Sequence, residues 1–180
     1  KADIERKIFF LLQPFDEIVC KFFYELSDKI FEDKLAKNYT DFIAYAFWIM
    51  RRNIIAFKNK FKRSMIRKPL GTIFHLTPNN VPLNFAYSLF FGLITGNNNI
   101  IKLPSKDFIQ NNLIINLILK ILKKKIYKKL NELVNFIKYD KNNIDITKTI
   151  SANSNARLIW GGDKTVDKLR KIYINPKTCI

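Results

Sequence analysis

The chain has 180 residues, of which 48% are hydrophobic; this is enough for one well-buried core and excludes an intrinsically disordered protein. No apolar run reaches the roughly 18 residues that span a bilayer, and no cleavage site follows the short apolar stretch near the start, so we expect neither stable membrane insertion nor a signal peptide. The formal net charge of +17 leaves a nucleic acid or an anionic membrane surface open as a partner.

Residues 1–66 are expected to form a helical N-terminal segment that packs on the rest of the core. Apolar side chains recur at helical spacing over residues 4–35, weakly toward the end of that range. Thr40 or Asp41 is placed to cap one longer helix, which runs to Phe61 and is apolar almost all round in its first half. Such a helix is normally buried, so its aromatic residues are interpreted as core packing rather than as an acyl pocket.

From residue 67 onward, short apolar runs alternate with helical stretches, so we expect an α/β domain over 67–180. Right-handed crossovers then make a doubly wound, mainly parallel sheet with flanking helices. Gly96 stands where the first of these helices needs a left-handed residue to end. The strands are expected at 71–76, 100–103, 133–139 and 157–160, and the helices at 82–95, from 104 to past 130, and at 163–171.

The densest run of charge, residues 120–129, falls in the second of these helices. Its apolar residues Ile121, Leu122, Ile126 and Leu130 keep helical spacing, so its lysines are interpreted as the solvated face of an amphipathic helix. The lysines also accompany many Asn and Ile residues, a mixture typical of AT-rich coding. We therefore expect no nucleic-acid partner. A basic module that binds nucleic acid or membrane is the alternative from a different class of function.

The cysteines and the lone histidine do not indicate a metal site. Neither Cys20 nor Cys179 belongs to a C-x-x-C pair, and with one histidine no zinc ligand set can be assembled. Two distant cysteines are typical of a reduced, cytoplasmic protein. Cys20 falls on an apolar helical face and is interpreted as structural. His75 lies inside the first strand and is interpreted as a packed residue rather than a base.

The most informative stretch is residues 71–105, GTIFHLTPNNVPLNFAYSLFFGLITGNNNIIKLPS, which makes one strand–helix–strand unit. In an open parallel sheet, ligands bind beyond the carboxyl ends of the strands. Asn80 and Lys102 fall at two such ends, and the Gly161–Gly162 corner follows a third strand. The sequence therefore predicts that an amide, an ammonium and a bare backbone corner surround one ligand.

This stretch resembles the nucleotide-binding half of the aldehyde dehydrogenase superfamily, whose first strand runs into a P-W-N-x-P-L turn. The run PNNVPLNFAYSLFFGLITGNNNIIKLPSK is more similar to the acyl-CoA reductases of the LuxC type, which feed bacterial bioluminescence. A second block at 156–165, ARLIWGGDKT, resembles the same reductases at the matching distance downstream. The resemblance implies an aldehyde dehydrogenase-like α/β fold with a Rossmann-type parallel sheet.

The resemblance also implies an activity: NAD(P)H-dependent reduction of an acyl-CoA, or another acyl thioester, to an aldehyde through a cysteine acyl-enzyme. In the family the nucleophile lies in a second, catalytic domain, which is missing from this chain. Cys179 is therefore not expected to be the nucleophile, and the chain alone is expected to be inactive. The complete enzyme is expected to be a homo-oligomer. Oxidation of an aldehyde by an aldehyde dehydrogenase-like protein is the alternative activity.

The turn from Thr77 to Pro82 holds two prolines that fix the backbone and two asparagines that are free to point into a cleft. A side-chain amide can donate a hydrogen bond to oxygen that becomes negative during acyl transfer. By resemblance, Asn80 falls on the asparagine with that role, whereas Asn79 replaces the usual tryptophan. We expect Asn80 to be catalytic and Thr77, Pro78 and Asn79 to contact the cofactor. The alternative is that both asparagines only stabilise a turn.

Lys102 ends an otherwise apolar strand, where its charge must reach solvent or an anion. By resemblance, a lysine here holds the adenosine ribose, and an acid a few positions on selects the unphosphorylated sugar. No acid stands at the matched place, and Ser105 and Lys106 offer a hydroxyl and a cation to a 2′-phosphate. We therefore expect NADP(H), with NAD(H) as the alternative cofactor and a solvated surface position as the alternative role of Lys102.

Gly161 and Gly162 let the backbone approach a ligand closely, and the helix that follows points free N–H groups at an anion. This arrangement suits a cofactor pyrophosphate. By resemblance, the two glycines occupy the Thr-Gly-Ser turn of the superfamily. Asp163 is expected either to meet the ligand or to cap the helix.

Overall fold

The structure is a computed structural model that describes residues 11–61, 67–140, 142–176 and 178–179. Within these residues, short strands form one parallel sheet in the order β3-β2-β1-β4. The parallel α/β sheet expected from the sequence is confirmed, and each strand lies within two residues of its expected bounds. The strands are β1 (Thr72–Leu76), β2 (Asn98–Lys102), β3 (Val134–Ile137) and β4 (Ala156–Ile159).

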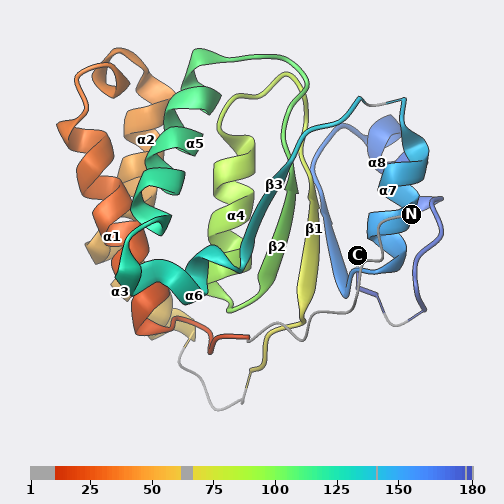
Figure 1. The fold of residues 1–180 in the computed structure, drawn as a ribbon, viewed down its shortest axis with the longest axis horizontal. Coiled ribbons are helices and arrows are strands. Elements are labelled where there is room, and N and C mark those ends of the chain that lie inside the picture. The colour runs from red at the N-terminus through yellow and green to blue at the C-terminus, as the bar shows by residue number, and fades with distance from the viewer. Residues whose placement is uncertain (1–10, 62–66, 141, 177, 180) are drawn as a thin grey trace.

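Helices cover both faces of the sheet (Figure 1). One face carries the N-terminal helices and the helices that follow β1 and β2. These are α1 (Glu17–Glu32), α2 (Thr40–Ile49), α3 (Arg51–Phe61), α4 (Asn84–Ile94), α5 (Ile109–Leu122) and α6 (Lys128–Asn131), with the 3-10 turns η1 (Ala36–Asn38) and η2 (Lys125–Tyr127). The other face carries α7 (Ile144–Ala152) and α8 (Asp163–Arg170). None of the described helices has the length and apolar character needed to cross a membrane.

The strand order reverses at β1. From β1 the chain moves outward through β2 to β3, and the connection through α7 then brings it back to the other side of β1. The loops that leave the carboxyl ends of β1 and β4 therefore diverge toward opposite faces of the sheet. In a doubly wound sheet such a reversal leaves a crevice at the carboxyl ends of the strands.

The hydrophobic core lies between the N-terminal helices, α4, α5 and the sheet. Phe22 of α1, Tyr45 of α2 and Phe85 of α4 have no exposed surface. The Tyr45 hydroxyl donates a hydrogen bond to the carbonyl of Ala86 (3.1 Å), which joins α2 to α4. One continuous cluster of buried side chains thus connects the N-terminal helices to the sheet domain. The division of the chain at residue 66 stays a prediction.

The start of the chain departs from the expected helices. Residues 1–10 and 62–66 lie outside the described residues, so the helix expected to begin near residue 4 is testable only at its end. Leu12 is not helical there, because its backbone N–H donates a hydrogen bond to the carbonyl of Gly96 (3.1 Å). Gly96 itself has the positive φ (85°) that its place after α4 predicts.

The single helix expected to run to Phe61 is wrong. The backbone is extended at Met50 (φ −64°, ψ 152°), which ends α2 before α3 begins at Arg51. The side-chain amide of Asn53 donates a hydrogen bond to the Phe47 carbonyl at the end of α2. Such a local side-chain bond competes with the regular helix ladder, and a periodic apolar pattern does not reveal it.

The helix expected over 104–130 is shorter and broken. Asp107, which was expected to lie in the first turn of this helix, instead precedes it and pairs with Lys138 (2.7 Å), and α5 begins only at Ile109. After Leu122 the chain forms η2 and α6 instead of further turns of α5, and extended backbone at Lys124 precedes η2. Three of the four apolar residues of the lysine run are buried as expected, but Ile126 is 60% exposed.

Helix α7 was not expected from the sequence. It is rich in β-branched Ile and Thr residues, which lower helix propensity. Its buried positions are Thr147 and Ser151 rather than large apolar side chains, so its apolar periodicity is weak. Packing against the sheet, not local propensity, decides that this segment is helical.

Candidate functional site

A cleft of about 1000 Å³ opens at the carboxyl ends of β1 and β4, where the strand order reverses. Its walls come from the turn after β1 and from the two helices on the far face, α7 and α8. Asn80, Lys102 and the Gly161–Gly162 corner all line it. The structure thus brings these three features to one cleft, as the sequence predicts, whereas the roles assigned to them stay predictions.

Two side chains tie the turn after β1 to the end of β2. Thr77 is buried, and its hydroxyl donates a hydrogen bond to the carbonyl of Lys102 (2.9 Å). The side-chain oxygen of Asn79 accepts a hydrogen bond from the backbone N–H of Ser105 (3.1 Å). Asn79 lines the cleft as expected, but its amide oxygen is engaged by the neighbouring loop, and its contact with a cofactor stays a prediction.

Asn80 lies on this anchored turn and keeps its amide available. It is exposed and, with Pro78, lines the cleft. Among the described residues, none forms a hydrogen bond with its side chain. An unengaged amide on a fixed turn can donate to an oxygen of a bound molecule. The geometry suits the donor role that the sequence predicts for Asn80.

Lys102 holds its charge in a buried place. It is 7% exposed, and its Nζ lies 5.0 Å from the centroid of the Tyr139 ring. Burial lowers the pKa of Lys102, and the negative charge of Asp140 partly opposes that shift. No carboxylate in the described part of the chain lies within ion-pairing distance of its Nζ. Since a buried cation without a carboxylate partner is unfavourable, an anion in the cleft would stabilise it.

The Gly161–Gly162 corner leads directly into α8, whose first backbone N–H groups have no partner within the helix. Lys164 and Lys168 follow one turn apart on the same face of α8 and also line the cleft. Together with Lys102 they bring three cations to it, and none of its described lining residues is acidic. A helix N-terminus and this charge balance both favour an anionic ligand.

Sequence reasoning missed the part of the lining that comes from the far face of the sheet. Asn142, in the loop before α7, and Thr147, in α7 itself, line the cleft, and this helix was not expected. Lys164 and Lys168 were also missed. Their spacing of four residues directly after the two glycines was the available signal for them.

Ser105, Lys106 and Asp163 lie outside the lining of the cleft. Ser105 is exposed, and the Nζ of Lys106 lies 5.0 Å from the ring centroid of Phe108. Asp163 is exposed and is the first residue of α8, so it follows the N-cap position instead of occupying it. The structure therefore does not gather these three residues with the other predicted site residues, and the capping role of Asp163 is wrong.

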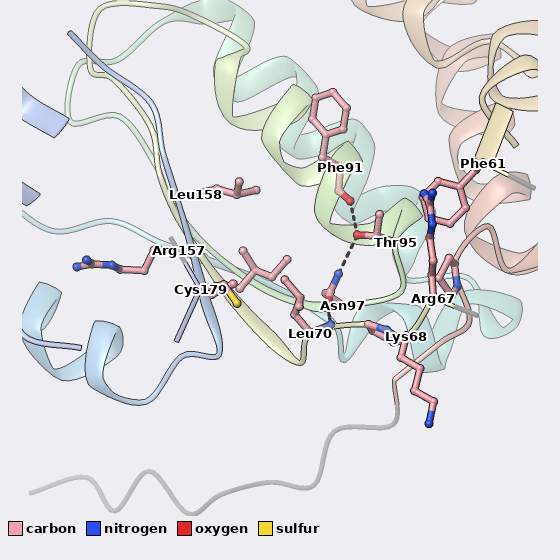
Figure 2. A pocket seen from close by; sticks show the side chains of 14 residues that line it. Phe61, Arg67, Lys68, Leu70, Phe91, Thr95, Asn97, Arg157, Leu158 and Cys179 are labelled. Carbon is pink, nitrogen blue, oxygen red and sulfur yellow. Dashed lines mark hydrogen bonds between the residues drawn. The ribbon is translucent and has the colours of Figure 1, made fainter. Parts of the chain in front are cut away.

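The cysteines and His75 also stay out of the cleft. His75 is fully buried, as expected for a packed residue, and burial lowers its pKa to about 4. Cys20 is buried in α1, where burial raises the pKa of its thiol. Cys179 pairs with Ala156 at the amino end of β4 and lines a separate, apolar pocket of about 590 Å³ (Figure 2). The described residues contain no cluster of three metal-ligating side chains.

A family model described as acyl-CoA reductase (LuxC) matches residues 37–180. The chain belongs to the LuxC family. The match contains both sequence blocks that build the cleft, the turn after β1 and the corner after β4. Among curated proteins, none matches this LuxC chain by sequence.

Solved structures show that the LuxC chain has the aldehyde dehydrogenase fold. Glyceraldehyde-3-phosphate dehydrogenase from Methanocaldococcus jannaschii, complexed with NADP, superposes with a TM-score of 0.68 at 20% identity, over 91% of this chain and 40% of that one. Betaine aldehyde dehydrogenase from Staphylococcus aureus, in complex with NAD+, gives a TM-score of 0.60 at 18% identity, over 87% and 35%. An aldehyde dehydrogenase mutant from Bacillus cereus gives 0.57 at 15% identity, over 85% and 35%. The LuxC chain thus spans 40% or less of each of these chains.

Proposed function

We propose that this chain forms the nicotinamide dinucleotide-binding part of an enzyme that reduces an acyl-CoA, or another activated acyl thioester, to an aldehyde. The observation that carries the proposal is the cleft at the reversal of strand order, where Asn80, Lys102 and the Gly161–Gly162 corner meet. Membership of an acyl-CoA reductase family and the aldehyde dehydrogenase fold support redox chemistry at an aldehyde carbon.

The chemistry of the cleft fits a dinucleotide. Its pyrophosphate carries the negative charge that the N-terminus of α8 and the nearby Lys164 and Lys168 attract. Lys102 would hold the adenosine end, because its Nζ needs an anion or a hydroxyl partner. When bound, the nicotinamide supplies the hydride.

Asn80 would act on the substrate rather than on the cofactor. Its free amide donates a hydrogen bond to the acyl oxygen as negative charge develops there, and loss of one such donor raises a barrier by about 3 kcal/mol. The chemistry also needs a thiolate, and neither Cys20 nor Cys179 lines the cleft. We therefore place the nucleophilic cysteine in a catalytic domain outside this chain, and we expect this chain alone not to turn over.

NADP(H) is the cofactor that we propose over NAD(H). An acidic side chain near the ribose binds the 2′-hydroxyl and repels a 2′-phosphate, whereas a cation accepts the phosphate. No described residue that lines the cleft is acidic, and Asp107, in the loop after β2, is already paired with Lys138. Lys102 is buried in the cleft and would meet the phosphate, with Lys106 farther out as a secondary contact.

The test is a titration of this chain with NADPH and with NADH by isothermal calorimetry. Lys102→Met removes the ammonium and keeps an unbranched side chain of similar length. We expect NADPH to bind about 10- to 150-fold more weakly to it, because a hydrogen bond to a charged group contributes roughly 1.5–3 kcal/mol. The preference for NADPH over NADH should shrink in the same variant.

Lys123→Met is the matched control, because Lys123 is exposed at the end of α5 and does not line the cleft. It makes the same change of net charge and should leave both affinities unchanged. The proposal is wrong if neither dinucleotide binds saturably to the folded parent chain. It is also wrong if Lys102→Met weakens NADPH binding no more than Lys123→Met does.

Oxidation of an aldehyde is the second candidate, because the solved structures that share the fold are aldehyde dehydrogenases. The two directions are separated with the protein encoded by the complete reading frame. A reductase consumes NADPH when it is given an acyl-CoA and releases free CoA. An aldehyde dehydrogenase instead produces NADPH or NADH from an aldehyde without any dependence on CoA.

A further inference from the structure

A series of buried polar side chains, joined by hydrogen bonds, runs from the cleft into the layer between α4 and the sheet. The indole Nε1 of Trp160, which lines the cleft, donates a hydrogen bond to the hydroxyl of Ser88 on α4 (2.9 Å). Ser88 lies 2.7 Å from Nδ1 of His75 on β1, and Nε2 of His75 lies 3.0 Å from the side-chain oxygen of Asn99 on β2. Ser88, His75 and Asn99 have no exposed surface.

The donor and the acceptor of each hydrogen bond in this series of side chains can be worked out by starting at Asn99. The side-chain nitrogen of Asn99 donates to the carbonyls of Asn97 (2.6 Å) and Leu133 (3.2 Å), so the Asn99 oxygen is left to accept. Burial keeps His75 neutral at pH 7, and its one N–H must therefore be on Nε2, where it donates to that oxygen. Nδ1 then accepts from the Ser88 hydroxyl, whose oxygen faces Trp160 as an acceptor.

Trp160 is consequently held at two points. Its backbone N–H donates to the carbonyl of Leu76 at the end of β1 (2.9 Å), and its indole is fixed by Ser88. The next two residues are Gly161 and Gly162, which have no side chains to pack and are exposed. The position of the corner at the start of α8 therefore depends on the residue that precedes it.

We propose that Ser88 is a positioning residue for the cleft: its hydroxyl, oriented by His75, anchors the indole of Trp160 and so places the Gly161–Gly162 corner for a dinucleotide. Ser88 does not line the cleft and acts only through Trp160. The inference rests on the proposed function for the identity of the ligand, whereas the anchoring of the indole stands on the hydrogen bonds alone.

The fluorescence of Trp160 can show whether its indole is held by Ser88. The chain has two tryptophans, so a Trp48→Phe background leaves Trp160 as the one fluorophore of its kind. In that background, Ser88→Ala should shift the emission of Trp160 and raise its rate of quenching by acrylamide, because the indole loses its partner. NADPH absorbs where tryptophan emits, so quenching of Trp160 also measures its binding. We expect Ser88→Ala to weaken NADPH binding about three- to tenfold, as loss of one hydrogen bond implies.

Ser27→Ala is the matched control, because Ser27 is 2% exposed and its hydroxyl donates to the carbonyl of Ala46 (2.9 Å), far along the chain from the cleft. It deletes the same group at similar burial, so it should lower the unfolding temperature without changing the emission or the NADPH affinity. If Ser88→Ala behaves like Ser27→Ala in both optical readouts, Ser88 is only a structural residue and the inference is wrong.

A second variant breaks the same bond from the other side and covers the case in which Ser88→Ala does not fold. Trp160→Phe removes the indole N–H, and calorimetry should show a similar loss of NADPH affinity. When both substitutions fold, adding Ser88→Ala to Trp160→Phe should weaken NADPH binding no further. Additive losses would overturn the inference, as would full affinity in Trp160→Phe. If the parent chain binds no dinucleotide, the proposed function fails, but the emission of Trp160 still decides whether Ser88 anchors it.

Discussion

Replacing Gly92 by alanine tests how closely α4 must approach the sheet. Gly92 lies on α4 next to the buried hydrogen bond between His75 of β1 and Asn99 of β2. A Cβ at this position would lie 1.8 Å from the side-chain oxygen of Asn99 and 3.0 Å from Cε1 of His75. Since real Cβ atoms essentially never approach within 3.0 Å, either the helix moves away or Asn99 rotates and loses its hydrogen bonds.

The size of the effect follows from three contributions. Alanine has the better helix propensity, which alone would stabilise the chain by about 1 kcal/mol. Overpacking a buried site costs about 1–3 kcal/mol. Each buried polar group that loses its partner costs roughly 1–3 kcal/mol more, and Asn99 makes three of these bonds. Gly92→Ala is therefore expected to lower the free energy of unfolding by about 2–4 kcal/mol, or the midpoint temperature by about 5–12 °C.

The assay is urea unfolding of this chain, followed by far-ultraviolet circular dichroism. An Asn99→Ala background removes the oxygen that the new Cβ would meet, so there Gly92→Ala should be neutral or stabilising by up to about 1 kcal/mol. Equal losses in the two backgrounds would refute the reasoning, because the clash would then not lie at Asn99. So would a Gly92→Ala variant as stable as the parent.

Two further predictions concern buried titratable groups. Burial lowers the pKa of His75 from the ordinary 6.5 to about 4, so the unfolded chain binds the extra proton between these values. The stability that this group contributes is fully present above about pH 6.5 and falls by about 3 kcal/mol as the pH drops to 4. When the free energy of unfolding from urea titrations is plotted against pH, it should therefore fall less steeply between pH 6.5 and 4 for His75→Gln than for the parent. Equal slopes for the two proteins would contradict this. Arg157 is 2% exposed and points away from the apolar pocket in Figure 2. Its Nη1 donates to the carbonyl of Leu169 (3.1 Å), while its Nε and Nη2 have no partner among the described residues, and burial lowers its pKa. Arg157→Met should leave the free energy of unfolding unchanged or raise it by about 1–2 kcal/mol, and a loss above about 2 kcal/mol would show that an anion or water satisfies the guanidinium.

Much of the fold could be predicted because its signals are local. β1 and β4, for example, are short runs rich in apolar residues, with Gly71 and Pro78 around the first and Asn155 and Gly161 around the second, and such runs mark buried parallel strands without knowledge of their neighbours. The break at Met50 and the helix α7 were not predicted. The first depends on a side-chain bond from Asn53 to a helix end, and the second on packing of a segment with weak apolar periodicity.

The convergence of Asn80, Lys102 and the Gly161–Gly162 corner could also be predicted, because parallel strands place all their carboxyl ends at one edge of the sheet. The direction of individual side chains could not. Asn79 lines the cleft, but its side-chain oxygen accepts a hydrogen bond from the backbone of Ser105, 26 positions away in the chain. Lys106 was expected in the site and lies outside its lining, whereas Lys164 lines it and was not expected.

The amino-acid order by itself thus determined the class of sheet, the family of the protein and the edge of the sheet at which polar groups gather. These depend on apolar periodicity and on turn residues within short windows of the chain. Only the tertiary structure decided which polar groups are used up inside the protein and which remain for a ligand. The same chemical group, an asparagine amide, binds the backbone of Ser105 at Asn79, binds buried His75 at Asn99 and has no hydrogen bond among the described residues at Asn80. Hydrogen bonds between distant segments make that difference, and they form only once the segments are packed together.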